Sequence, residues 1–205
     1  MRIAVIDYGA GNLRNVCKAL EHVGAELVLT SDIRELERAD KIVLPGVGAF
    51  ADCLQGLQSR SLFDSLRRVA LAGKPLLGIC VGMQLLFEIG EEMGEWPGLG
   101  LIGGRVVRFP NSTLKVPHIG WNQIQSRRDH PLLAGIQPGS YTYFVHSYYP
   151  VVDDQAHVVA TTEYGVEFAS IVAKGDVWGI QFHPEKSQEA GLAMLRNYVH
   201  HLPCH

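Results

Sequence analysis

The stretch Pro75-Leu76-Leu77-Gly78-Ile79-Cys80-Val81-Gly82-Met83-Gln84 decides the fold, because it predicts a buried strand that turns sharply into a helix with a cysteine at the corner. Gly78 and Gly82 flank the cysteine and lack the Cβ atoms that would clash in such a turn. The following helix, Met83 to Glu88, would aim its free N–H groups at the sulfur and favour the thiolate, which attacks carbonyl carbon. The stretch therefore suggests acyl-transfer chemistry, although a buried, unreactive cysteine explains it equally well.

A second segment, Val177 to Lys186, supplies a base and an acid. Its alternating apolar residues predict a strand that ends at His183-Pro184-Glu185. Residues i and i+2 of an extended chain point to the same side, so His183 and Glu185 can lie together. A carboxylate fixes the tautomer of an imidazole base and stabilises its charged form. Cys80, His183 and Glu185 are therefore the predicted catalytic residues, with a solvated His-Glu pair at a strand end as the alternative.

A third segment predicts a site for an oxyanion. Ile42-Val43-Leu44 reads as a short buried strand that opens into Pro45-Gly46-Val47-Gly48. A loop with glycine on both sides of Val47 can present backbone N–H groups to developing negative charge. The pattern Gly46-x-Gly48-x-x-Ala51 also fits a loose dinucleotide fingerprint. We discount that interpretation because Pro45 precedes the first glycine and no acidic residue ends a following strand about twenty positions later.

The composition favours one α/β domain over residues 1–205. The chain is 47% hydrophobic and 19% charged, and no linker or repeat marks a second domain. A net charge of −3 gives no electrostatic case for nucleic acid or a membrane surface, and no stretch approaches the ~20 apolar residues of a membrane span. The four cysteines show no C-x-x-C spacing, which favours reduced thiols and the cytoplasm. We expect no metal, since a fraying tail explains His200, His201, Cys204 and His205 better than a metal cluster does.

The order of elements predicts a mainly parallel central sheet covered by helices on both faces, with an additional antiparallel or mixed β region. The site would then lie at the carboxyl edge of the sheet. Strands are expected at 3–7, 27–29, 42–44, 101–109, 121–125, 141–149, 157–162, 168–173 and 177–182, and helices at 13–22, 33–38, 61–71 and 190–202, with a helical pattern through Ala51, Leu54 and Leu57.

Taken together, the motifs resemble the class I, triad-type glutamine amidotransferases from end to end of the chain. Three stretches carry the family resemblance: Pro45 to Gly48, Gly78 to Gln84, and Gln181 to Glu185. Within that family the chain is most similar to the glutaminase subunits of imidazole glycerol phosphate synthase, the histidine-pathway enzyme. The narrowing features are Asp7-Tyr8-Gly9-Ala10-Gly11-Asn12-Leu13, Pro117-His118-Ile119-Gly120-Trp121-Asn122, Tyr143-Phe144-Val145-His146-Ser147-Tyr148 and His183-Pro184-Glu185-Lys186-Ser187.

The resemblance implies a flavodoxin-like fold and hydrolysis of L-glutamine through a thioester, without a cofactor. It implies an oxyanion site at the N–H groups of Val47 and Val81, and substrate contacts at Gly46, Gly48, Gln84, Ser147 and Tyr148. It also implies a heterodimer with a (β/α)8 barrel cyclase that consumes the ammonia. The expected interface residues are Asn12, Asn15, His118, Trp121, Asn122, Tyr143 and Lys186.

Three alternatives remain open from the sequence. The chain could serve another synthase, such as that of pyridoxal phosphate. It could be a cysteine peptidase, since the same three residues would serve a peptide. It could also be a non-catalytic scaffold, which the joint presence of Cys80, His183 and Glu185 argues against.

Overall fold

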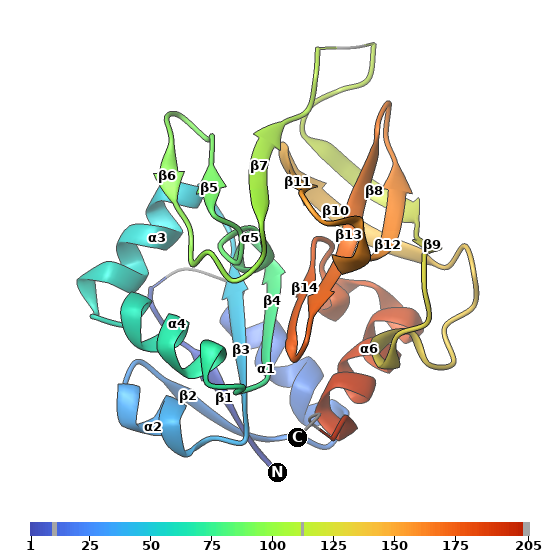
Figure 1. The fold of residues 1–205 in the computed structure, drawn as a ribbon. Coiled ribbons are helices and arrows are strands. Elements are labelled where there is room, and N and C mark those ends of the chain that lie inside the picture. The colour runs from blue at the N-terminus through green and yellow to red at the C-terminus, as the bar shows by residue number, and fades with distance from the viewer. Residues whose placement is uncertain (10–11, 112, 203–205) are drawn as a thin grey trace.

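An eight-stranded sheet forms the centre of the computed structural model, which describes residues 1–9, 12–111 and 113–202 (Figure 1). Five strands of the sheet are parallel, and the last three are antiparallel. Every residue of the two central strands, β3 (Lys41–Gly46) and β4 (Leu76–Cys80), is buried, as their continuous apolar runs predict for a sheet covered on both faces. The strand order is β2 (Glu26–Thr30), β1 (Arg2–Ile6), β3 (Lys41–Gly46), β4 (Leu76–Cys80), β14 (Val177–Ile180), β13 (Glu167–Lys174), β12 (Val158–Glu163) and β9 (Gln125–Ser126).

Two groups of helices cover the sheet, as predicted. The chain moves outward from β1 to β2 and then back through β3 to β4, so right-handed crossovers place α1 on one face and the next helices on the other. The first group is α1 (Leu13–His22) with α6 (Gln188–His200), and the second is α2 (Ile33–Arg38), α3 (Phe50–Ser59) and α4 (Phe63–Leu71) (Figure 1).

Two smaller sheets form the predicted additional β region. One pairs β8 (His118–Gln123) with β10 (Tyr141–His146), and the other has the order β11 (Tyr148–Val152), β7 (Gly104–Arg108), β5 (Ile89–Gly90) and β6 (Trp96–Pro97). The expected single strand over 141–149 is wrong, because the chain passes from one sheet to the other at Ser147. The Ser147 carbonyl accepts a hydrogen bond from the Phe109 N–H at 3.0 Å, beside the β7–β11 pair.

The helix after the cysteine is shorter than predicted. α5 spans only Val81–Gln84, a single turn. Beyond it, the carbonyls of Leu85 and Leu86 accept hydrogen bonds from the N–H groups of Leu99 and Leu101, at 2.7 and 2.9 Å. These tertiary bonds use the acceptors that a longer helix would need, so the helical pattern of 83–88 does not propagate.

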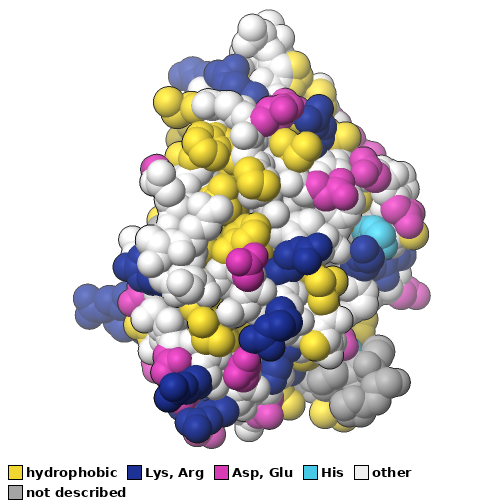
Figure 2. All heavy atoms as spheres, turned by 60° about the vertical axis from the view of Figure 1, so that its left-hand side comes forward, with side chains coloured by type: hydrophobic (Ala, Val, Ile, Leu, Met, Phe, Trp, Pro, Cys, Tyr) yellow, Lys and Arg dark blue, Asp and Glu magenta, His cyan; other side chains and the backbone are white. Residues whose placement is uncertain are grey.

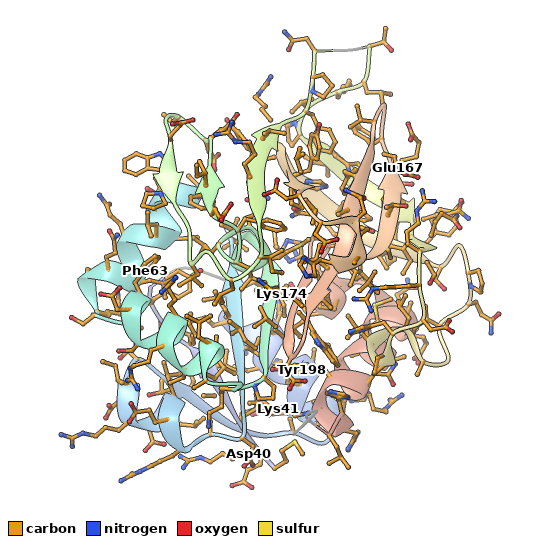
Figure 3. All side chains as sticks on the ribbon, viewed as in Figure 1. Asp40, Lys41, Phe63, Glu167, Lys174 and Tyr198 are labelled. Atoms are coloured by element: carbon orange, nitrogen blue, oxygen red, sulfur yellow. The ribbon has the colours of Figure 1, made fainter. Side chains whose placement is uncertain are left out.

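A buried lysine fastens α6 to the central sheet at the edge opposite the carboxyl ends. Lys41 Nζ donates to the carbonyls of Tyr198, Val199 and His201, and the Tyr198 hydroxyl lies 2.8 Å from the Ile42 carbonyl. Figure 3 shows Lys41 and Tyr198 together at the lower end of the sheet. Burial lowers the pKa of Lys41 to about 8. The last-turn carbonyls of α6 are thus satisfied by β3 rather than by water.

Charges of both signs share the face that carries α2 and α4. In Figure 2, Lys and Arg side chains lie among Asp and Glu side chains on this face. Arg68 bonds Glu37 at 2.7 Å and Arg2 bonds Glu35 at 2.6 Å, so these charges are paired locally. No helix among the described residues is long and apolar enough to cross a membrane.

Candidate active site

Cys80 occupies a strained corner between β4 and α5. Its φ and ψ are 56° and −115°, a region that residues other than glycine rarely adopt. A Cβ on Gly78 would lie 2.5 Å from the Gly82 carbonyl oxygen, and a Cβ on Gly82 would lie 1.9 Å from that of Leu44. The structure therefore contains the predicted elbow, and both flanking positions require glycine.

Parallel pairing brings distant segments of the sequence to one edge of the sheet. Gly46, at the end of β3, is in register with Cys80, and Ile180, at the end of β14, is in register with Ile79. The chain continues from β14 to His183, whose N–H donates to the Tyr143 carbonyl at 2.9 Å. A cavity of about 260 Å³ opens there, lined by Val47, Gly48, Cys80, Val81, Gln84, Glu92, Pro117, Val145, His146, Ser147, Tyr148 and His183.

His183 and Glu185 form the predicted pair. His183 Nδ1 lies 2.8 Å from Glu185 Oε1, and the side chains are only 3% and 1% exposed. The predicted reason is wrong, because Pro184–Lys186 form a 3₁₀ turn rather than an extended chain, and this turn carries Glu185 back to the imidazole. Asn12 Nδ2 also donates to Glu185 Oε1 at 3.2 Å, so this oxygen has two side-chain partners.

The electrostatics of His183 suit a base that faces a thiol. Burial lowers the pKa of His183, but interaction with Cys80 and Glu185 outweighs burial and raises it to about 10. Burial raises the pKa of Glu185, but the bond to His183 outweighs this and holds the pKa below its ordinary value. At neutral pH the imidazole therefore carries a proton on Nε2, which is buried without a hydrogen-bond partner among the described residues and is available to give that proton to a group in the cavity.

Two buried side chains hold the end of β3 and the loop that follows it. The Tyr8 hydroxyl donates to the Pro45 carbonyl at 2.6 Å, and Cys53 Sγ lies 3.5 Å from the Val47 carbonyl oxygen. A Cβ on Gly46 would meet Gly82 N at 2.6 Å, so Gly46 allows the loop to approach the elbow. Val47 itself remains 37% exposed at the mouth of the cavity.

Most of the predicted oxyanion and substrate residues line the cavity. Gly46 is the exception, since it packs behind the lining residues. The predicted residues that do line the cavity are Val47, Gly48, Val81, Gln84, Ser147 and Tyr148. Gln84 Nε2 donates to the Tyr148 carbonyl at 3.0 Å and to Gln181 Oε1 at 3.1 Å. Because its N–H groups are used within the chain, Gln84 could meet a ligand only through its amide oxygen.

Sequence reasoning missed two polar residues of the cavity. Glu92 points a carboxylate toward the start of α3, where it accepts from the Phe50 N–H at 2.7 Å. Nothing in the sequence separates Glu92 from the neighbouring surface acid Glu91. His146 lies inside the quoted motif Tyr143 to Tyr148, so its membership of that motif is the signal that could have identified it.

Several predicted interface residues gather beside the His183 turn. Trp121 is 46% exposed and meets Tyr143 edge to face at 6.0 Å, and Lys186 Nζ lies 5.7 Å from the Tyr143 ring centroid. Asn15 is exposed, and Asn12 and Asn122 are half-buried.

The prediction for His118 needs correction. Its side chain is 3% exposed and stacks between Phe144 and Tyr164, so it cannot contact a partner directly. Strand alternation explains the difference, since His118 points inward while its neighbour Ile119 is 59% exposed.

The remaining predictions concern the cysteines and the C-terminal tail. Cys17, Cys53 and Cys80 are free thiols. Within 1–9, 12–111 and 113–202, no three His, Cys, Asp or Glu residues are grouped as metal ligands. Cys204 and His205 lie outside the described residues, as do Ala10 and Gly11 of the N-terminal motif.

Residues 4–202 match the family model for the class-I glutamine amidotransferases. The chain belongs to this family. Curated relatives named imidazole glycerol phosphate synthase subunit HisH include one from Methanosarcina acetivorans, 53% identical over 97% of this chain and 98% of its own length. Another, from Geobacter sulfurreducens, is 49% identical over 96% and 97% of the two chains. The predicted resemblance to this group is confirmed.

Solved structures show the same fold at lower identity. The PurLQS structure from Thermotoga maritima superposes with a TM-score of 0.75 at 23% identity, covering 96% of each chain. A putative GMP synthase subunit from Thermoplasma acidophilum gives 0.73 at 20% identity, covering 97% of this chain and 92% of its own. The predicted class I amidotransferase fold is thus confirmed, and the chain is an amidotransferase whose family reaction is hydrolysis of glutamine.

Proposed function

We propose that the chain, as the glutaminase subunit of an imidazole glycerol phosphate synthase, hydrolyses L-glutamine through Cys80, His183 and Glu185. One observation carries the proposal: the Glu185-bound imidazole of His183 lines the same cavity as Cys80, which is held at a strained elbow. A thiol, a base and an orienting carboxylate so arranged suffice for acyl transfer.

The proposed reaction proceeds in two halves. The Cys80 thiolate attacks the side-chain amide carbon, and the oxyanion is stabilised by the N–H groups of Val47 and Val81. His183 then gives a proton to the amide nitrogen, so the C–N bond breaks, ammonia leaves and a thioester remains. His183 next takes a proton from water, which attacks the thioester and releases glutamate from the sulfur. Glu185 stays ionised and orients the imidazole throughout.

The rest of the cavity would hold the amino-acid end of glutamine. The backbone at Gly48, Ser147 and Tyr148 offers peptide groups in the wall of the cavity. Glu92 supplies a carboxylate there, which suits an α-ammonium group. The proposed subsite thus combines backbone groups for the carboxylate with one acid for the amine.

An apolar surface beside the catalytic turn suits the proposed barrel cyclase. We define the β8–β10 face as Ile119, Trp121, Tyr141 and Tyr143. Three of these side chains, at 59%, 46% and 57%, are unusually exposed for large apolar groups. Asn12, another expected interface residue, bonds Glu185, so a partner that contacts Asn12 and this face would lie against the catalytic turn and help to keep water from the ammonia.

Replacing ammonium salts by glutamine tests the function. When the chain is mixed with a purified cyclase subunit and the phosphorylated ribulosyl carboxamide, glutamine should support formation of imidazole glycerol phosphate, measured by chromatography. The cyclase alone should require ammonium. If the mixture still needs ammonium while free glutamine is hydrolysed, the assignment to this synthase is wrong and another partner must use the ammonia.

The interface has its own test. Trp121→Ala should raise the Kd for the cyclase by at least about tenfold, because buried aromatic anchors dominate such interfaces. Val151→Ala is a matched control, since Val151 in β11 is also 46% exposed but lies outside the β8–β10 face. Its Kd, measured by calorimetry, should match that of the unmodified chain. Equal Kd values for both variants would place the interface elsewhere.

A further inference from the structure

Two buried histidines, one in the wall of the cavity and one behind it, take no part in the proposed proton transfers. His118 in β8 and His146 in β10 face each other in register, and His118 Nδ1 lies 3.1 Å from His146 Nε2. They are 3% and 5% exposed. His118 stacks against Tyr164 and Phe144 with ring centroids 4.0 and 4.8 Å away. This pair is therefore sealed among aromatic rings.

The contact of His146 with the backbone fixes its tautomer. His146 Nδ1 lies 2.8 Å from the Tyr148 carbonyl oxygen, and a carbonyl can only accept, so Nδ1 carries the proton. Burial lowers the pKa of His146 to about 3 and that of His118 to about 4, so both rings are neutral at physiological pH. His146 Nε2 is then an acceptor and must receive the proton of His118 Nδ1.

Asn122, at the other end of this chain of hydrogen bonds, gives the same direction of donation. His118 Nε2 has a lone pair left, and Asn122 Nδ2 lies 3.3 Å from it. Backbone groups fix the orientation of this amide, because Asn122 Nδ2 donates to the Glu163 carbonyl at 2.9 Å and Oδ1 accepts from the Gln123 N–H at 2.8 Å. The hydrogen bonds from Asn122 to His118, from His118 to His146 and from His146 to the Tyr148 carbonyl therefore all run in one direction. We call these three residues the imidazole relay.

The relay ends on a carbonyl in the wall of the cavity. The Tyr148 oxygen also accepts from Gln84 Nε2 at 3.0 Å, so donors hold it from two directions. Tyr148 begins β11 directly after the Ser147 crossover and pairs with Arg108 at the end of the β7–β11 ladder. Without the imidazole, this carbonyl would lose one of its two side-chain donors and keep only Gln84.

We propose that His146 and His118 are positioning residues that fix the Ser147–Tyr148 backbone in the orientation that binds glutamine. The inference rests on the proposed function for its kinetic consequence, but the direction of the hydrogen bonds does not. Neither ring touches the reacting atoms in this proposal. The relay should therefore govern the affinity for glutamine rather than the chemistry at Cys80.

Replacement of His146 tests the kinetic part. With the cyclase subunit present, His146→Phe keeps a planar ring but removes both nitrogens, and it should raise KM for glutamine by at least about tenfold while kcat changes by less than about threefold. His146→Asn should restore most of the affinity, because its amide N–H occupies the place of Nδ1 and can reach the Tyr148 carbonyl. A general structural role would not be rescued by so small a side chain.

A matched control and a thiol probe complete the kinetic test. His130 is another histidine packed on an aromatic ring, 4.6 Å from Trp178 and outside the cavity, so His130→Phe should leave KM unchanged. Alkylation of Cys80 by iodoacetamide, which needs no glutamine subsite, should proceed equally fast in the native chain and in His146→Phe. Unchanged KM in His146→Phe would overturn the positioning role, and so would a failure of His146→Asn to restore the affinity.

Nitrogen NMR tests the relay independently of any activity and of the His146 variants. With ¹⁵N-labelled histidine in the native chain, both rings should show a protonated Nδ1 and a bare Nε2 between pH 6 and 8. Asn122→Asp places an acceptor beside His118 Nε2, so that this nitrogen should become protonated. A protonated Nε2 on either ring of the native chain would overturn the inference. Absence of glutaminase activity with the expected tautomers would instead refute the proposed function alone.

Discussion

Replacement of Cys80 by alanine should abolish glutamine hydrolysis, with turnover falling by at least ~10⁴-fold. The sulfur supplies the bond to the acyl group in the proposed mechanism, and no other described thiol lines the cavity. The fold should survive, because the 3% exposed side chain loses only one atom at a corner that the backbone fixes. Glutamate release and thermal unfolding, measured on the same preparation, check both expectations.

Cys17→Ala is the control for loss of a thiol. Cys17 lies on α1, and burial raises its pKa, so at neutral pH it is protonated and unreactive. This variant should hydrolyse glutamine as fast as the native chain. A glutamine analogue with an electrophilic carbon should label Cys80 alone, as located by mass spectrometry. Hydrolysis that persists in Cys80→Ala would refute the proposed nucleophile and, with it, the thioester.

The central sheet was predictable because each of its inner strands is a short apolar run bounded by polar or turn residues. Two layers of helices are needed to bury both faces of such runs, as in Ile42 to Leu44 and Leu76 to Cys80. The crossover at Ser147 was not predictable, since the alternation of Tyr141 to Tyr149 continues through it without a turn signal. A change of sheet depends on tertiary partners such as Phe109, which a local pattern does not reveal.

The reactive residues were predictable for a similar local reason. Cys80 needs small neighbours, and the base and acid lie two positions apart, so each leaves a compact trace in the sequence. Glu92 leaves no such trace in the sequence. It lines the cavity because the chain at 89–97 folds back and brings its carboxylate to the Phe50 N–H. His118 shows the opposite error: its motif was noticed, but the side to which it points is decided by register in a two-stranded sheet.

The elbow also predicts a large loss of stability. Gly82→Ala would place a Cβ 1.9 Å from the Leu44 carbonyl oxygen and 2.9 Å from the Leu44 carbonyl carbon. Both atoms belong to the backbone of β3, a fully buried strand that cannot move without disturbing its pairing with β1 and β4. The clash can therefore be relieved only if the elbow itself shifts. We expect the free energy of unfolding to fall by at least about 3 kcal/mol, as measured by urea denaturation.

Gly103→Ala separates this clash from the general effect of adding a methyl group. Gly103 has no positive φ, and its new Cβ would first meet Asp153 Oδ2 at 3.3 Å, the end of a flexible side chain. Its unfolding free energy should stay within about 0.5 kcal/mol of that of the native chain. If Gly82→Ala were equally harmless, the β3 backbone would have to yield at the elbow. The strain at Cys80 would then not be enforced by the sheet, and the nucleophile would owe its exposure to the cavity to some other contact.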